Sequence, residues 1–286
     1  MISVKIICMN RTVIKKGWMI FFLCLYVGLF LIATWKDLSI SMYATSHAPG
    51  WYVHAGDAVG TAIPTCTAGV GCAGLYQCER REKKKGQWFW LLLFVLLAFL
   101  TGWLLFRHGS TVSMIIGTAV TAVIYLFVFM TAGKAMDGSD ENIHTVCLAI
   151  IADVILSMVI VNVLKLIWAR PRFIYMDDPQ REFKAWYVIN GPALVSDAYK
   201  SFPSAHTVSA GTSLSLCWLP CACTKLKDRK KTILVLTWIV ILFVAVSRIF
   251  AGMHFLSDTL GGMGLAVLIY WLLDRRVCRN ETKAVD

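Results

Sequence analysis

Long apolar runs recur through this sequence, and they limit what the chain can fold into. A helix needs about 20 predominantly apolar residues to cross a bilayer, and eight segments approach that length. They lie at 17–35, 54–76, 88–106, 112–131, 143–164, 205–221, 233–250 and 256–273. Hydrophobic residues make up 58% of the chain and charged residues 16%, against about 45–50% and about 25% in soluble domains. We therefore predict an all-α, polytopic transmembrane helical bundle of about eight spans.

Two of the runs allow more than one interpretation. Segment 54–76 is rich in Gly, Ala and Thr, and small residues let helices approach closely. We expect a helix buried inside the bundle, with a re-entrant or surface segment as the alternative. The run at 17–35 follows Lys15 and Lys16, as the apolar part of a signal peptide would. Its length of about 19 residues exceeds that of a signal h-region and no convincing cleavage site follows, so we expect a first transmembrane helix.

The net charge of +11 is unevenly distributed along the chain. Basic clusters lie at 5–16, at 79–85 (ERREKKK), at 225–231 (KLKDRKK) and in the tail DRRVCRN. Cytoplasmic loops collect Lys and Arg, and eight spans put all four clusters on one face of the membrane. We therefore predict a multi-pass protein of the cell or plasma membrane, with both termini cytoplasmic and no nucleic-acid partner.

The opposite, extracytoplasmic face gathers cations and histidines at the ends of the predicted spans. The first such stretch is KLIWARPRF, in which Lys165 ends a helix, Pro171 breaks it and Arg172 follows. A Lys and an Arg near a membrane boundary also reach out to lipid headgroups. This stretch alone therefore does not separate a binding site from an interface anchor.

The second stretch is SFPSAHT. Ser201 is expected to cap a helix that starts near Pro203, because Pro is favoured in the first turn. Free backbone N–H groups at a helix start form an anion site, to which Ser204 adds a hydroxyl and Ala205 an N–H. His206 can exchange a proton near neutral pH, although a lone histidine is more often structural.

The third stretch is SRIFAGMHFLSD, in which Arg248 ends the seventh span. His254 and Asp258 are spaced i, i+4 and would share one face of a helix. A carboxylate on one imidazole nitrogen fixes the tautomer and leaves the other nitrogen free to attack. An HxxxD pair is common, so this stretch is also weak evidence when taken alone.

Together the three stretches resemble the motifs of the type-2 phosphatidic acid phosphatase superfamily, whose members use a histidine nucleophile. The family patterns K-x6-RP, PSGH and SR-x5-H-x3-D appear here in order as Lys165-x6-Arg172-Phe173, Pro203-Ser204-Ala205-His206 and Ser247-Arg248-x5-His254-x3-Asp258. Phe173 in place of Pro and Ala205 in place of Gly are departures. Ala205 is tolerated if its φ is negative, as we expect in the first turn of a helix; an inactive homologue is the alternative.

The resemblance implies a two-step hydrolysis of a phosphate ester, with no metal and no other cofactor. It assigns His254 as the nucleophile that forms a phosphohistidine, Asp258 as the group that orients it, and His206 as general acid and base. It assigns phosphate binding to Lys165, Arg172, Ser204, Ala205 and Arg248. The substrate would be a lipid phosphate or pyrophosphate of the phosphatidate, phosphatidylglycerol phosphate or polyprenyl pyrophosphate class.

The resemblance also implies an organisation of the chain, with a six-helix phosphatase-like core plus extra helices. About four N-terminal spans would occupy 1–142, the catalytic core with the three motifs 143–275, and a short cytoplasmic tail 276–286. The loop 174–200 is expected to lie over the site and to shape the choice of headgroup. Arg170 is expected either to contact a second phosphate or headgroup, or to anchor the chain at the interface.

Two other functions remain open. A lipid phosphotransferase on the same scaffold would pass the phosphoryl group to a second acceptor instead of water. A multi-span transporter would place the histidines in an ion path, but transporters often show internal repeats and midplane sites, and here the titratable residues gather at one face. Asp153 in the fifth span is left outside the site, although intramembrane acids are functional candidates. The sequence does not indicate an oligomeric state.

Overall fold

The computed structural model describes residues 16–107, 109–192 and 196–283, and every regular element within them is a helix. Seven of these helices are long and apolar enough to cross a membrane. They are α2 (Lys16–Ser46), α3 (Gly50–Arg81), α4 (Gln87–Phe106), α5 (Thr111–Ala135), α6 (Asp140–Trp168), α9 (Lys230–Phe250) and α10 (Leu256–Lys283). The predicted all-α transmembrane bundle is therefore confirmed. The basic cluster at 5–16 lies outside the described residues except for its last position.

The remaining expected crossing, 205–221, is helical but is not one regular helix. It is divided into α8 (Ala205–Gly211) and the 3-10 helix η4 (Thr212–Cys221). Three hydroxyl side chains at the start of η4 each donate to the backbone carbonyl three residues back. Ser and Thr side chains compete in this way with regular helical hydrogen bonds, which accounts for the tighter winding. Within the described part of the chain, the long helices therefore number seven rather than eight.

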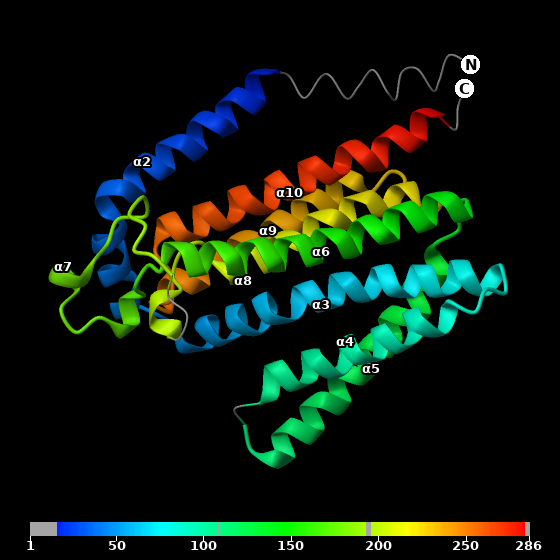
Figure 1. Cartoon of the computed structure of the whole chain (residues 1–286), viewed down its shortest axis with the longest axis horizontal. Coiled ribbons are helices and arrows are strands. Elements are labelled where there is room, and N and C mark those ends of the chain that lie inside the picture. The colour runs from blue at the N-terminus through cyan, green and yellow to red at the C-terminus, as the bar shows by residue number, and fades with distance from the viewer. Residues whose placement is uncertain (1–15, 108, 193–195, 284–286) are drawn as a thin grey trace.

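The weak second run forms α3, which lies at the centre of the bundle. Of its apolar window 61% is buried, against 22% for α4 and 17% for α5. The pair α4 and α5 packs on one side of α3, and α6, α8 and α9 also contact it (Figure 1). The small side chains of α3 permit this close approach, so the expectation of a buried helix is confirmed.

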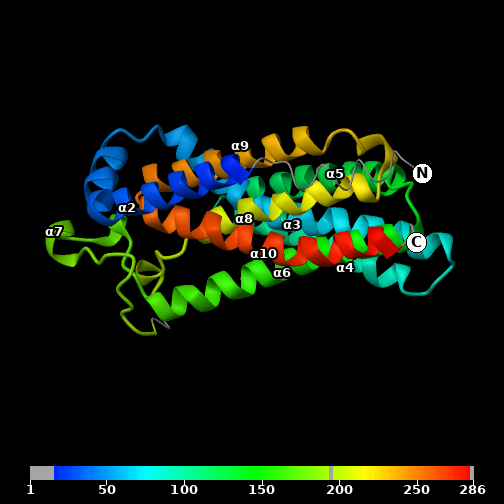
Figure 2. The same ribbon diagram turned by 90° about the horizontal axis from the view of Figure 1, so that it is seen from above.

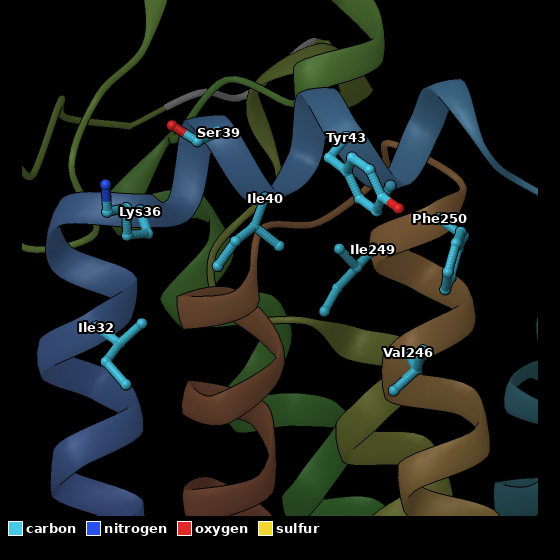
Figure 3. Close-up of a pocket in the computed structure, with 9 residues that line it drawn as sticks. Ile32, Lys36, Ser39, Ile40, Tyr43, Val246, Ile249 and Phe250 are labelled. Atoms are coloured by element: carbon cyan, nitrogen blue, oxygen red, sulfur yellow. The ribbon is translucent and has the colours of Figure 1, made fainter.

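The first helix, α2, continues well past the expected 17–35 and ends at Ser46. It lies against α9 and α10 (Figure 2). It bends near Lys36, so that its second half turns away from the direction of its first half (Figure 3). An apolar groove of about 470 Å³ lies between α2 and α9 at this bend, lined among others by Ile40, Tyr43 and Phe250.

The helices alternate in direction, so alternate loops share an end of the bundle. The basic loops 79–85 and 225–231 lie at one end, and the last turn of α6 and the first turn of α10 lie at the other (Figure 1). The loop after α6 contains η2 (Phe173–Tyr175), α7 (Pro179–Glu182) and η3 (Asp197–Tyr199). Trp186 attaches this loop to α2, because its Nε1 donates to Thr34 Oγ1 at 3.1 Å.

The expected boundaries between regions of the chain fall inside helices. The N-terminal part, 1–142, ends within the first turn of α6, which begins at Asp140. The expected tail, 276–286, starts within α10, which continues to Lys283. From the N-terminal part, α2 and α3 contact helices of the expected catalytic core, and both contribute side chains to the site.

Candidate active site

Backbone hydrogen bonds join the three motifs at one end of the bundle. The Ser201 N–H donates to the Arg170 carbonyl at 2.9 Å, which links the first motif to the second. The Ser204 N–H donates to the Asp258 carbonyl, also at 2.9 Å, which links the second motif to the third. The structure therefore places the three predicted stretches next to one another, although they are far apart in the sequence.

His254 lies in the turn between α9 and α10 and is 1% exposed. Its Nδ1 lies 2.7 Å from the Ser201 carbonyl oxygen. A carbonyl only accepts hydrogen bonds, so Nδ1 carries the hydrogen and Nε2 of the neutral ring carries the lone pair. Burial lowers the pKa of His254 to about 3. The imidazole is thus oriented and uncharged, with Nε2 able to act as a nucleophile.

Asp258 occupies a different position from the one expected. His254 precedes α10, whereas Asp258 lies in its first turn, so the two do not share a helical face. The Asp258 Oδ2 atom is 3.8 Å from His254 Nδ1 and accepts hydrogen bonds from Ser201 Oγ at 2.6 Å and the Phe255 N–H at 2.8 Å. Asp258 therefore acts on the imidazole mainly through Ser201, whose carbonyl makes the direct contact.

Arg170 is fully buried and does not reach toward a headgroup or the interface, so both expected alternatives for it are wrong. It donates to Asp258 Oδ1 at 2.5 Å and to Asp37 Oδ2 at 3.0 Å, and its other donors reach Ser257 Oγ and the Lys184 carbonyl. Its guanidinium also lies 4.2 Å from the centre of the Phe255 ring. The two carboxylates and three further contacts satisfy a buried cation that would otherwise be very costly.

Three cations predicted to bind phosphate lie around the same turn. Lys165, in the last turn of α6, is 4% exposed and donates to the Lys200 carbonyl. The Arg172 Nη1 atom contacts Met253 Sδ at 3.5 Å, and a thioether is a weak acceptor. Among the described residues, the Nε atoms of Arg172 and Arg248 have no hydrogen-bond partner. Buried donors without partners are costly, so these guanidinium groups are suited to binding an anion.

The helix cap of the second motif is Ser204, so the prediction that Ser201 caps this helix is wrong. The Ser204 Oγ atom accepts from the Thr207 N–H at 3.4 Å and from Thr207 Oγ1 at 3.0 Å. Ser201 is unavailable for this purpose because its hydroxyl donates to Asp258. Ala205 is the first residue of α8 and is not among the residues with positive φ.

His206 contacts a carboxylate that the sequence reasoning missed. Its Nε2 lies 3.3 Å from Asp57 Oδ1, and the same oxygen lies 2.8 Å from Arg248 Nη1. Asp57 comes from the start of α3, the weakest of the predicted spans. Asp37 at the bend of α2 was missed as well. The rule that intramembrane acids are functional candidates was available for Asp57, which lies in the predicted run 54–76, but it applies equally to Asp153, which is buried in α6. Asp37 lies just past the predicted run 17–35, so the rule did not select it.

Among the residues that the structure describes, no group of three or more His, Cys, Asp or Glu is placed to hold a metal ion. The two carboxylates closest to the histidines, Asp57 and Asp258, are each paired with an arginine.

Comparisons with known proteins point to one family. Residues 145–280, which contain all three motifs, match the model of the PAP2 superfamily. Phosphatidylglycerophosphatase B of Bacillus subtilis (strain 168) is 30% identical over 95 residues, which cover 32% of this chain and 47% of that protein. The chain thus spans about half the length of this curated relative.

The comparison with solved structures also gives a match. It is the crystal structure of the first transmembrane PAP2 type phosphatidylglycerolphosphate phosphatase from Bacillus subtilis, with 17% sequence identity and a TM-score of 0.39. The match covers 89% of this chain and 93% of the solved one.

Proposed function

We propose that the chain, whose residues 145–280 match the model of the PAP2 superfamily, is an integral membrane phosphatase acting on a lipid phosphate or pyrophosphate. The observation that carries this proposal is the state of His254. It is a buried, neutral imidazole whose Nδ1 is fixed by a carbonyl at 2.7 Å, beside cations with unused donors. Such a group is an activated nucleophile.

The proposed reaction has two steps through a phosphohistidine. In the first step His254 Nε2 attacks phosphorus, an N–P bond forms, and the P–O bond to the lipid breaks as His206 gives a proton to the leaving oxygen. In the second step water attacks phosphorus, His206 takes a proton from it, and the N–P bond breaks to release inorganic phosphate. Asp258 stabilises the positive charge that His254 carries in the intermediate.

The cations and the start of α8 supply the electrostatic part of catalysis. Phosphoryl transfer depends mainly on positioning and on charge stabilisation. Lys165, Arg172 and Arg248 would bind the nonbridging oxygens, together with the Ser204 hydroxyl and the Ala205 N–H.

An apolar groove lined in part by residues of the first and third motifs supports a lipid substrate. It measures about 470 Å³ and is lined by residues from α2, α3, η2 and α9. Phe173, which follows Arg172, and Ala251, which lies just past Arg248, are both in its lining. An acyl or prenyl chain in this groove would contact these two motif residues. Since the curated relative is a phosphatidylglycerophosphatase, phosphatidylglycerol phosphate is the first of the three lipid classes to test.

We also propose that the site opens on the extracytoplasmic face and that both termini are cytoplasmic. The basic loops at 79–85 and 225–231 support this orientation, because they lie at the end of the bundle opposite the motifs (Figure 1). We retain 143–275 as the catalytic core.

The test compares wild type with His254→Ala in detergent micelles. Phosphate release is measured from phosphatidate, phosphatidylglycerol phosphate and polyprenyl pyrophosphate, with EDTA present. His144→Ala is the matched control, because His144 is an exposed histidine near the far end of α6. We expect release by wild type and by the control, and none by His254→Ala. Equal release by His254→Ala would refute the mechanism, and transfer of phosphate to an added alcohol in place of water would favour the phosphotransferase.

A further inference from the structure

Among the described residues, Asp57 is the acidic side chain that touches both His206 and a predicted phosphate-binding cation. A single oxygen, Oδ1, lies 3.3 Å from His206 Nε2 and 2.8 Å from Arg248 Nη1. The Asp57 side chain is 53% exposed, whereas that of Arg248 is 3% exposed. The carboxylate therefore lies where the buried site meets solvent.

Two glycines of α3 bring Asp57 to this position. A Cβ added to Gly56 would lie 1.8 Å from Ser247 Oγ, in the residue before Arg248. A Cβ added to Gly60 would lie 2.9 Å from His206 Cδ2. Neither distance is sterically possible without a shift of the neighbour. The absence of these two side chains lets α3 pack directly against the second and third motifs, with Asp57 between the two points of contact.

We propose that Asp57 is a positioning residue for His206, a role that rests on the phosphatase function proposed above. A carboxylate only accepts hydrogen bonds, so Nε2 of His206 carries a hydrogen in this contact and Nδ1 is the nitrogen that exchanges a proton with the substrate. Burial disfavours the protonated ring of His206, and the Asp57 carboxylate offsets part of that effect. Asp57 thus orients the His206 ring for donation of the Nδ1 proton. The same carboxylate fixes His206 relative to the Arg248 guanidinium, which is predicted to bind phosphate.

In this arrangement, the proton that His206 donates in the first step is replaced in the second step. His206 gives the Nδ1 proton to the oxygen that leaves with the lipid alcohol, while the Nε2 hydrogen stays in the contact with Asp57. The water of the second step returns a proton to Nδ1. Asp57 itself remains ionised throughout and forms no bond to phosphorus.

This role predicts a dependence on the leaving group. An alkoxide leaves poorly unless it is protonated, so hydrolysis of a lipid phosphate requires the acid. A nitrophenolate leaves well without a proton, so the first step with p-nitrophenyl phosphate, seen as nitrophenolate release in the first turnover, depends on His254 and the cations but little on His206. A purely structural role of Asp57 would affect both substrates equally.

The experiment measures kcat and KM for Asp57→Asn on phosphatidate micelles, and the rate of nitrophenolate release in the first turnover of p-nitrophenyl phosphate. Because general acid catalysis contributes about 10²–10⁴-fold, we expect kcat on phosphatidate to fall by about 10–100-fold. We expect the first-turnover rate on the aryl ester to change by less than about 3-fold. Asp57→Glu should recover part of the loss. Glu82→Gln, which removes an exposed carboxylate just past the other end of α3, should match wild type.

Three results would overturn the proposal: an equal loss on both substrates, an unchanged kcat on phosphatidate, or a faster Asp57→Asn. The last would mean that the carboxylate obstructs phosphate binding. The aryl ester reports folding of the variant within the same assay. A wild type that hydrolyses neither substrate would refute the phosphatase function and this role with it, whereas an active wild type with an unaffected Asp57→Asn refutes the role alone.

Discussion

Replacing Asp37 by Asn should destabilise the protein, because this carboxylate holds the bend of α2 against the catalytic turn. Asp37 is 1% exposed. It accepts from Arg170 Nη2 at 3.0 Å, from the Ser257 N–H at 3.0 Å, and from the Ser257 hydroxyl. The amide side chain of the Asp37→Asn variant would keep the shape and one acceptor oxygen. It would lose the charge, and it would point an N–H₂ group at donors.

The size of the effect follows from the burial of the ion pair. Removing one partner of a buried ion pair costs about 3–5 kcal/mol. Arg170 keeps its contact with Asp258 at 2.5 Å, so the lower end of that range applies. A loss of about 3 kcal/mol in the free energy of unfolding corresponds to a melting temperature lower by about 6–12 °C.

Buried thiols allow the unfolding of the variant to be followed with a dye. Cys72 and Cys147 are free and 0% exposed, so a thiol-reactive fluorescent dye reports unfolding in detergent as they become accessible. Glu82→Gln removes a carboxylate from an exposed ion pair with Lys84, and exposed pairs contribute little, so it should melt like wild type. An Asp37→Asn variant that melts within about 2 °C of wild type would refute the reasoning, since that shift corresponds to less than about 1 kcal/mol.

Three further changes test the geometry around the histidines. Gly60→Ala places a methyl group 2.9 Å from His206 Cδ2, so kcat should fall by about 10-fold or more while the melting temperature changes little, because small displacements of catalytic groups are costly; an unchanged kcat would contradict the close approach. Ser201→Ala removes the 2.6 Å hydrogen bond to Asp258 but keeps the carbonyl that orients His254, so unfolding should become easier by about 1–3 kcal/mol while kcat falls only a few-fold. Burial lowers the pKa of His254 to about 3, so the ring is protonated only in strong acid. Phosphoenzyme formation from an aryl phosphate should therefore be as complete at about pH 5 as at about pH 7. An unperturbed histidine, with a pKa of about 6.5, would be mostly protonated at about pH 5 and would form less phosphoenzyme there.

The features that could be predicted from the sequence are those that depend on residues close together in the chain. The spans follow from apolar length, and the burial of α3 follows from its small side chains. The three motifs have fixed internal spacing, so their residue types and order could be recognised without a structure. The expected crossing at 205–221 was less regular than predicted, because a run of hydroxyl side chains winds its second half more tightly.

Contacts between distant segments could not be predicted from the sequence. Asp37 and Arg170 are separated by 133 positions, and no local pattern pairs them. Asp57 lies in a helix whose composition suggested only close packing. The position of Asp258 relative to His254 was mispredicted for a different reason. The i, i+4 spacing assumed that α10 begins before His254, whereas it begins at Leu256.

The most direct test of the account is to trap the phosphoenzyme. The protein is mixed with radiolabelled phosphatidylglycerol phosphate, quenched with base, which preserves phosphohistidine, and digested for mass spectrometry. The account predicts label on His254, none in His254→Ala, and a labelled His206→Ala when an aryl phosphate replaces the lipid, since that variant lacks the base for the second step. Label on another residue, or phosphate release with no labelled protein in any variant, would contradict it.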